Sequence, residues 1–276
     1  MGKIGLALGG GGVRGLAHIS VLEVLDELDC KPSVIAGTSM GAVIGALYAS
    51  GMSGKDIKEL VRQHIISKDD HFRDVIDKRS GVLKLAGAFT LEHARGGIIK
   101  ADKFYNHLFG GIDKTTFEDL EIPLIIIATD YWTADEVVFE TGELLPAIKA
   151  SAAVPGVFAP ISIEGRILVD GGVVNSVPYE HVMNLCDVTI AVDVAGTHTP
   201  RKHEIPSILE SILGTFHIMQ TAALAAKMKY VQPDIYVRPD IHDVRLLDLN
   251  KIEVVFEQAA PAVEELKVQL SQIKFE

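Results

Sequence analysis

The chain has 276 residues, of which 48% are hydrophobic and 23% are charged, so it is long enough to bury a substantial core. Its 26 lysines and arginines stand against 37 aspartates and glutamates, and the net charge of −11 argues against nucleic-acid partners and against electrostatic adsorption to anionic membranes. Two cysteines are too few for a disulfide framework, and neither a signal peptide nor an apolar run of about eighteen residues is apparent, so we expect a cytoplasmic protein without a transmembrane span.

The first two predicted strands enclose a glycine loop and a helix. Residues 4–8 form an uncharged apolar run, which is typical of a buried strand, and residues 9–12 are all glycine. Apolar residues then recur every three or four positions over 13–28, which predicts an amphipathic helix. Residues 32–36 predict a second short strand, so the whole segment is expected to be a βαβ unit.

The second strand leads directly into Gly37-x-Ser39-x-Gly41, the pattern of a strand–turn–helix elbow that exposes a serine hydroxyl. Glycine at both flanking positions removes the Cβ atoms that would clash in such a turn. The glycine loop offers bare backbone amides at a helix N-terminus, where the helix dipole favours negative charge. Because parallel strands bring both turns to one sheet edge, we expect the loop and Ser39 to lie side by side, as an acyl-transfer site requires.

The same glycines also fit a dinucleotide-binding fingerprint, Gly10-x-Gly12-x-x-Gly15. That fold places an acidic residue about twenty positions further on, at the end of the second strand, where it binds the ribose. Here residues 36–39 end the strand without an acid, which argues against a nicotinamide or flavin cofactor. No Gly-Lys-Ser or Gly-Lys-Thr follows the loop, which excludes a P-loop.

The middle of the chain gives weaker signals. It predicts a helix at 55–61, further helices over 64–78, a loop–helix segment at 81–97 and a short helix at 101–109. The histidines of this region do not have the spacing of metal ligands, so we expect no metal site; they are His64, His71, His93 and His107.

Beyond residue 120 the apolar pattern of strands returns. Strands are predicted at 122–130, 136–140, 166–170 and 188–193, with a helix at 144–153 between them. This alternation predicts an α/β fold with three layers, in which a mostly parallel central sheet carries helices on both faces.

Asp170 is the acid that we pair with Ser39. It is predicted at the C-terminal end of a strand, where open α/β sheets bind their ligands, and two glycines follow it. Asp130 and Asp193, which also follow strands, are its competitors. If a histidine were the base, the candidates would be His18, His198 and His217, although we expect His18 to pack and hydrogen-bond beside the glycine loop.

The last third predicts a long helix over 205–228 with a broad apolar face, a strand at 233–239 and a closing helix at 256–273. Core packing is the favoured interpretation of that apolar face. A lid, a homodimer surface and a lipid-facing patch remain open alternatives.

Three motifs together resemble the patatin-like phospholipases, specifically their compact bacterial branch: residues 9–18, residues 37–42 and Asp170-Gly171-Gly172. Residues 117–130 and 150–160 resemble that family as well. The resemblance is strongest over residues 3–195, and it implies that 1–276 is a single domain in which 200–276 is a C-terminal extension.

The resemblance implies a catalytic dyad without histidine, in which Ser39 is the nucleophile and Asp170 its base. It also implies that the amides of Gly10, Gly11 and Gly12 form the oxyanion hole and that Arg14 supports this loop. The sequence departs from many relatives at two places. Ser20 stands where they carry glycine, and the motif Asp-Gly-Gly stands where they carry Asp-Gly-Ala.

The resulting hypothesis is a serine acyl hydrolase that cleaves lipid esters through an acyl-enzyme, with no cofactor and no metal. Under this hypothesis the protein could also contact a membrane peripherally or form a homodimer through 205–228, and the sequence leaves both open. One alternative is a non-catalytic regulatory or scaffold protein that retains the fold. Another is an acyltransferase or thioesterase that acts on carrier-bound acyl chains.

Overall fold

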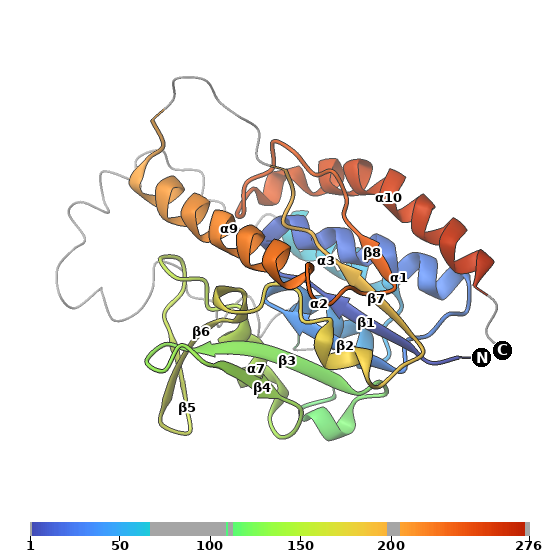
Figure 1. The fold of residues 1–276 in the computed structure, drawn as a ribbon, viewed down its shortest axis with the longest axis horizontal. Coiled ribbons are helices and arrows are strands. Elements are labelled where there is room, and N and C mark those ends of the chain that lie inside the picture. The colour runs from blue at the N-terminus through green and yellow to red at the C-terminus, as the bar shows by residue number, and fades with distance from the viewer. Residues whose placement is uncertain (1, 67–108, 110–112, 198–204, 274–276) are drawn as a thin grey trace.

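The computed structural model describes residues 2–66, 109, 113–197 and 205–273 (Figure 1). Most of the segments predicted between 64 and 109 therefore lie outside the described residues, as do the candidate base His198 and the histidines His71, His93 and His107.

The described residues form one eight-stranded sheet in the order β5-β6-β3-β2-β1-β7-β8, with β4 paired to β3 off this path. The five strands from β3 to β8 in that order run parallel, whereas β4, β5 and β6 are antiparallel to their neighbours. The strands are β1 (Ile4–Leu8), β2 (Val34–Thr38), β3 (Leu124–Asp130), β4 (Glu136–Phe139), β5 (Ile161–Ile163), β6 (Arg166–Asp170), β7 (Val188–Val192) and β8 (Ile235–Val237).

Helices and 3-10 turns connect these strands. The α-helices are α1 (Ala17–Glu27), α2 (Met40–Ala49), α3 (Gly54–Ile66), α7 (Leu144–Ser151), α8 (Glu180–Met183), α9 (Ile208–Lys227) and α10 (Ile252–Gln272). The 3-10 turns are η1 (Gly12–Leu16), η2 (Phe117–Asp119), η3 (Gly171–Val173) and η4 (Leu249–Lys251). The first predicted helix thus begins with the 3-10 turn η1 before it continues as α1.

Apolar side chains leave the sheet on both faces and create the three predicted layers. Leu6 and Leu8 of β1 belong to the main core, which α1, α2, α3, α7 and α10 cover. Ala7, between them, faces the opposite side and packs in a second cluster with Val182 of α8 and Leu224 of α9. The predicted fold class, an α/β sheet with helices on both faces, is confirmed.

One edge of β3 brings two distant segments end to end. On this edge β2 pairs with the first half of β3, up to Thr38 opposite Ile127, and β6 pairs with the second half, where Asp170 lies opposite Ala128. Strand β4 occupies the other edge. Asp170 therefore lies next to the end of β2, because β6 runs antiparallel to β3 and its C-terminal end meets the C-terminal end of β2. We had expected Asp170 to end a strand parallel to β2.

Helix α9 differs from the expectation of core packing. Among its described side chains only Leu224 is buried, whereas Ile208 is 82% exposed and Ile205, just before the helix, is 95% exposed. In Figure 1 the last turns of α9 lie near the centre of the molecule and its first turns lie at the periphery. No helix in the described part of the chain has the length and apolar character to cross a membrane.

Candidate active site

Ser39 lies on a strained turn between β2 and α2. Its backbone has φ 55° and ψ −121°, which is costly for a residue with a Cβ atom, by about 1–3 kcal/mol. A Cβ atom on Gly41 would collide with the carbonyl of Leu8, so only glycine fits there. The side chain is 6% exposed. The strand, turn and helix predicted around Ser39 are thus confirmed.

Hydrogen bonds from several directions hold this turn. The Ser39 amide donates to Oγ of Ser151 at 2.8 Å, and its carbonyl accepts from the amides of Ala42 and Val43 at 3.0 and 3.1 Å. The neighbouring Thr38 hydroxyl donates to the Asn175 carbonyl at 2.9 Å. The strained conformation is therefore fixed by contacts on both sides of the serine.

Asp170 is 1% exposed and ends β6. Its Oδ1 accepts from the Gly172 amide at 2.8 Å, whereas Oδ2 has no hydrogen-bond partner among the described residues. Burial raises the pKa of Asp170 to about 6, and the nearby Ser39 hydroxyl and the Gly172 amide oppose that rise. The fold thus brings the Ser39 hydroxyl close enough to influence the Asp170 carboxylate, although Oδ2 of Asp170 accepts no hydrogen bond from it in this structure.

The competing acids have other partners. Asp130 accepts from the amides of Trp132 and Thr133 at 2.9 and 3.3 Å, which closes the turn after β3. Asp193 accepts from the Tyr236 hydroxyl at 2.7 Å, and also from the Ala195 amide. Of the three acids, only Asp170 has a fully buried carboxylate oxygen without a hydrogen-bond partner in the described part of the chain.

His18 holds the glycine loop, as we had expected. Its Nε2 lies 2.7 Å from the Gly9 carbonyl, and complete burial lowers the pKa of His18 to about 4. The ring is therefore neutral at pH 7, and because a carbonyl only accepts, Nε2 carries the proton. The other histidine within the described residues that was a candidate base, His217, lies on α9.

The glycine loop lies against Ser39, because a Cβ atom built on Gly10 would stand 3.3 Å from the Ser39 Cβ. The predicted proximity of loop and serine is confirmed. The Gly10 amide, however, donates to the Ser176 carbonyl at 2.9 Å, so it is not free for an oxyanion in this structure. The amides of Gly11 and Gly12 have no such partner among the described residues.

Arg14 is buried below the loop, and its Nε donates to the Gly11 carbonyl at 3.4 Å. Burial lowers the pKa of Arg14 to about 10, while the charge of Asp193 opposes that shift, so the guanidinium stays charged at pH 7. A trans peptide points its N–H away from its C=O. By holding the Gly11 carbonyl, Arg14 therefore also orients the amide of Gly12.

The comparison with known families decides the identity of this arrangement. The sequence profile described as patatin-like phospholipase matches residues 6–183, which include the glycine loop, Ser39 and Asp170. The chain belongs to the patatin-like phospholipase family. The resemblance inferred from the three motifs is thereby confirmed.

Relatives of this patatin-like chain include longer proteins. An uncharacterized NTE family protein of Mycobacterium tuberculosis is 33% identical over 224 residues, which cover 80% of this chain and 57% of that protein. Lysophospholipase NTE1 of Candida glabrata is 27% identical over 281 residues, or 93% of this chain and 16% of that protein. The chain thus spans little more than half the length of the first relative.

A solved structure shares the architecture. The crystal structure of VipD from Legionella pneumophila aligns with a TM-score of 0.50 over 96% of this chain and 67% of that chain, at 13% identity. At that identity the similarity concerns the fold alone.

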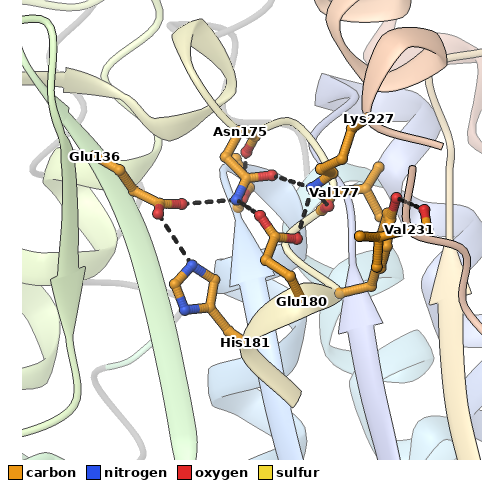
Figure 2. A network of polar contacts seen from close by, with 9 residues as sticks. Glu136, Asn175, Val177, Glu180, His181, Lys227 and Val231 are labelled. Carbon is orange, nitrogen blue, oxygen red and sulfur yellow. Dashed lines mark hydrogen bonds and ion pairs between the residues drawn. The ribbon is translucent and has the colours of Figure 1, made fainter. Parts of the chain in front are cut away.

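A polar network next to the patatin-like site contains the described residues best placed to share an ion (Figure 2). Ligand atoms of Glu136, Glu180 and His181 lie within 4.8 Å of one another. Both carboxylates accept from Nδ2 of Asn175 at 2.7 Å, and the Lys227 ammonium donates to Glu180 at 2.6 Å. Glu136 also accepts a hydrogen bond from His181, and this contact raises the pKa of His181. Lysine and amide donors thus already satisfy these carboxylates.

Sequence reasoning missed several residues that support the patatin-like site. Ser151 holds the Ser39 amide, the Asn175 carbonyl holds Thr38, and the Ser176 carbonyl holds Gly10. Ser151 lies in the stretch 150–160 that resembled the family, yet no spacing marks one serine there as a partner of Ser39. The carbonyls carry no sequence signal, because every residue has one.

Proposed function

We propose that this patatin-like protein is a serine acyl hydrolase that cleaves lipid esters through an acyl-enzyme on Ser39. One observation carries the proposal: a serine on a strained turn lies next to a fully buried carboxylate whose pKa is raised to about 6 and whose Oδ2 lacks a partner within the described residues. A carboxylate of ordinary pKa, near 4, is a weak base. Burial makes Asp170 a stronger base, yet it remains ionised at pH 7.

The proposed reaction begins when the Ser39 oxygen attacks the ester carbonyl and its proton passes to Asp170. The carbonyl oxygen becomes an oxyanion, which the amides of Gly11 and Gly12 stabilise, with Gly12 oriented through Arg14. The C–O bond to the alcohol then breaks, and the alcohol takes the proton from Asp170. In the second half-reaction water attacks the acyl-enzyme and gives a proton to Asp170. The bond between the acyl carbon and the Ser39 oxygen then breaks, the carboxylic acid leaves, and Asp170 returns the proton to Ser39.

An apolar cluster supports a lipid substrate. Val154 and Val157 pack with Leu213, Phe216 and Leu246, apart from the main core. The cluster adjoins both catalytic turns: the Leu246 carbonyl accepts from Val13 at the glycine loop, and the carbonyl of Ala153, just before Val154, accepts from the Asp170 amide. Apolar side chains this close to the nucleophile suit an acyl chain. The name of one relative, lysophospholipase NTE1 of Candida glabrata, agrees with that choice.

The test compares hydrolysis of p-nitrophenyl esters of increasing chain length, and of lysophosphatidylcholine, by the full chain and its variants. We expect Ser39→Ala to lose turnover entirely and Asp170→Asn to lose about 10²–10⁴-fold. Ser33→Ala, which removes a hydroxyl bonded to the Ile4 carbonyl at the far end of β2, is the matched control and should retain activity. Full activity in Ser39→Ala would refute the proposal.

The same assay, extended to a thioester substrate and an added acyl acceptor, separates the alternatives. A non-catalytic scaffold would turn over none of these esters although its site residues are intact. A thioesterase or acyltransferase would form the acyl-enzyme but would prefer a thioester substrate or an acceptor other than water.

Partners beyond the substrate also stay proposals. Exposed Ile205, Ile208 and Ile212 would suit either a homodimer through 205–228 or peripheral contact with uncharged lipid. A doubled mass in light scattering supports the former, and vesicle binding that salt does not weaken supports the latter.

A further inference from the structure

We propose that the C-terminal end of α7 sets the geometry between Ser39 and Asp170, with Ser151 as a positioning residue for the nucleophile. The proposal rests on the function proposed above, because it concerns how the same two side chains are aligned. It assigns a role to a residue that neither the serine motif nor the aspartate motif contains.

The first contact is the hydrogen bond from the Ser39 amide to Oγ of Ser151, at 2.8 Å. Ser39 is the N-cap of α2, so its amide has no acceptor within that helix. Ser151 is completely buried. The Ser151 hydroxyl is thus the acceptor that the structure gives this amide, at a residue whose backbone is strained.

The second contact comes two residues later along the same segment. The Ala153 carbonyl accepts from the amide of Asp170 at 3.0 Å, and the Thr129 hydroxyl donates to the Asp170 carbonyl at 3.0 Å. Both backbone polar groups of Asp170 are therefore fixed, one by the segment that holds Ser39 and one by β3.

The segment between the two contacts is itself well anchored. Ala152 and Ala153 donate to the carbonyls of Ile148 and Ala150 at 3.0 and 3.2 Å, which continues the last turn of α7. Ile148 and Ala150 are fully buried. A short, packed turn thus connects the backbone of the nucleophile to the backbone of its base.

Ser151 could instead serve only to satisfy a buried amide, and the two roles predict different results. A purely structural role lowers stability and leaves the chemistry of the folded protein unchanged. A positioning role lowers kcat in protein that is fully folded, because a displacement of about 1 Å at a reacting group costs up to about 10²-fold in rate.

The experiment measures kcat, KM and thermal unfolding for the full chain carrying Ser151→Ala, with Ser33→Ala as the control that loses a comparable hydroxyl far from the site. We expect kcat to fall about 10- to 100-fold for Ser151→Ala, with KM within about twofold of the wild type. Ser33→Ala should keep the wild-type kcat. Ser151→Thr, which restores a hydroxyl, should recover most of the lost kcat.

The pH profile gives a readout that stability alone would not change. The Ser39 hydroxyl helps to stabilise the charged form of Asp170. If Ser151→Ala lets Ser39 move away, the acid limb of kcat/KM should shift to higher pH, whereas Ser33→Ala should leave it in place.

Equal kcat values and acid limbs for Ser151→Ala and Ser33→Ala would overturn the proposal. If Ser151→Ala is unfolded at the assay temperature, Ser151→Cys, which keeps a small side chain, takes its place with the same criteria. Failure here is distinct from failure of the proposed function, which would show as activity in Ser39→Ala.

Discussion

At the scale of single residues, Asp170 combines a chemical advantage with a cost in stability. Its pKa lies near 6 in the folded protein, against an ordinary value of 3.8. The folded state therefore favours the neutral carboxyl, and ionisation at neutral pH works against folding. Below about pH 4 both states are protonated and the cost is absent; it grows as pH rises to about 6 and then stays constant.

Replacing Asp170 with Asn should therefore stabilise the protein while it removes the proposed base. A shift of about two pKa units corresponds to at most about 3 kcal/mol at pH 7. The measurement is thermal unfolding of wild type and Asp170→Asn between pH 4 and pH 8. We expect a higher melting temperature for the variant above pH 6 and convergence of the two towards pH 4.

Asp130→Asn is the control, because that carboxylate already accepts two backbone hydrogen bonds in its turn. It should give no gain in stability at neutral pH. If Asp170→Asn melted below the wild type at pH 7, ionisation of buried Asp170 would not destabilise the folded protein, and the argument from its raised pKa would fail.

Some residues of the site could be predicted from the sequence, and others could not. Ser39, Asp170 and the glycine loop were predicted because glycines mark turns with unusual backbone geometry. The engagement of the Gly10 amide could not be predicted, because its acceptor is a carbonyl of Ser176, brought close only by tertiary structure. Ser151 could not be predicted for the same reason, because only tertiary structure brings it to the Ser39 amide.

At the scale of elements, Lys227 fastens the end of α9 to the segment that follows η3. Its ammonium donates to Asn175 Oδ1, the Val177 carbonyl and Glu180 Oε2 at 2.8, 2.7 and 2.6 Å, as Figure 2 shows in part. It also lies 4.3 Å from the centre of the Tyr179 ring. The Asn175 carbonyl in turn accepts from the Thr38 hydroxyl, so this anchor is one contact away from the turn that carries Ser39.

Lys227→Met should loosen this end of α9, because it removes three hydrogen bonds from a charged donor and leaves Glu180 without its ion pair. We expect a loss of roughly 1–3 kcal/mol in the free energy of unfolding. We also expect faster amide exchange in the last turns of α9.

Lys229→Met makes the same change in charge at an exposed position two residues away. Its free energy of unfolding should stay within about 0.5 kcal/mol of the wild type. Equal stability of Lys227→Met and Lys229→Met would show that the network does not anchor α9.

Predicted elements differ in how well the sequence specifies them. The parallel strands β1, β2, β3 and β7 were predicted because they are buried on both faces and therefore continuously apolar. Three-residue β5 and four-residue α8 are too short for a periodic signal. For α9, periodicity revealed an apolar face but not what covers it, which explains why its exposure was unexpected.

At the scale of the whole molecule, one core joins the beginning and the end of the chain. The main apolar cluster runs from Ile4 to Leu270, and β7 pairs with β1 along its full length. Helices α1 and α10 are also tied by the ion pair of Glu27 and Lys267. We infer that the described residues fold as a single unit, in which the C-terminal part helps to hold β1 and its glycine loop in place.

This framework has one main chemical consequence, the alignment of a serine and a buried acid at the meeting point of β2 and β6. The most direct test is the rate at which a fluorophosphonate probe modifies the protein as a function of pH, with the adduct located by peptide mass spectrometry. We predict an adduct on Ser39, formed at a rate that falls about tenfold per pH unit below the raised pKa of Asp170, about 6. Asp170→Asn should react about 10²–10⁴-fold more slowly and lose that inflection. An adduct on another residue, or an inflection near pH 6 that persists in Asp170→Asn, would contradict the assignment.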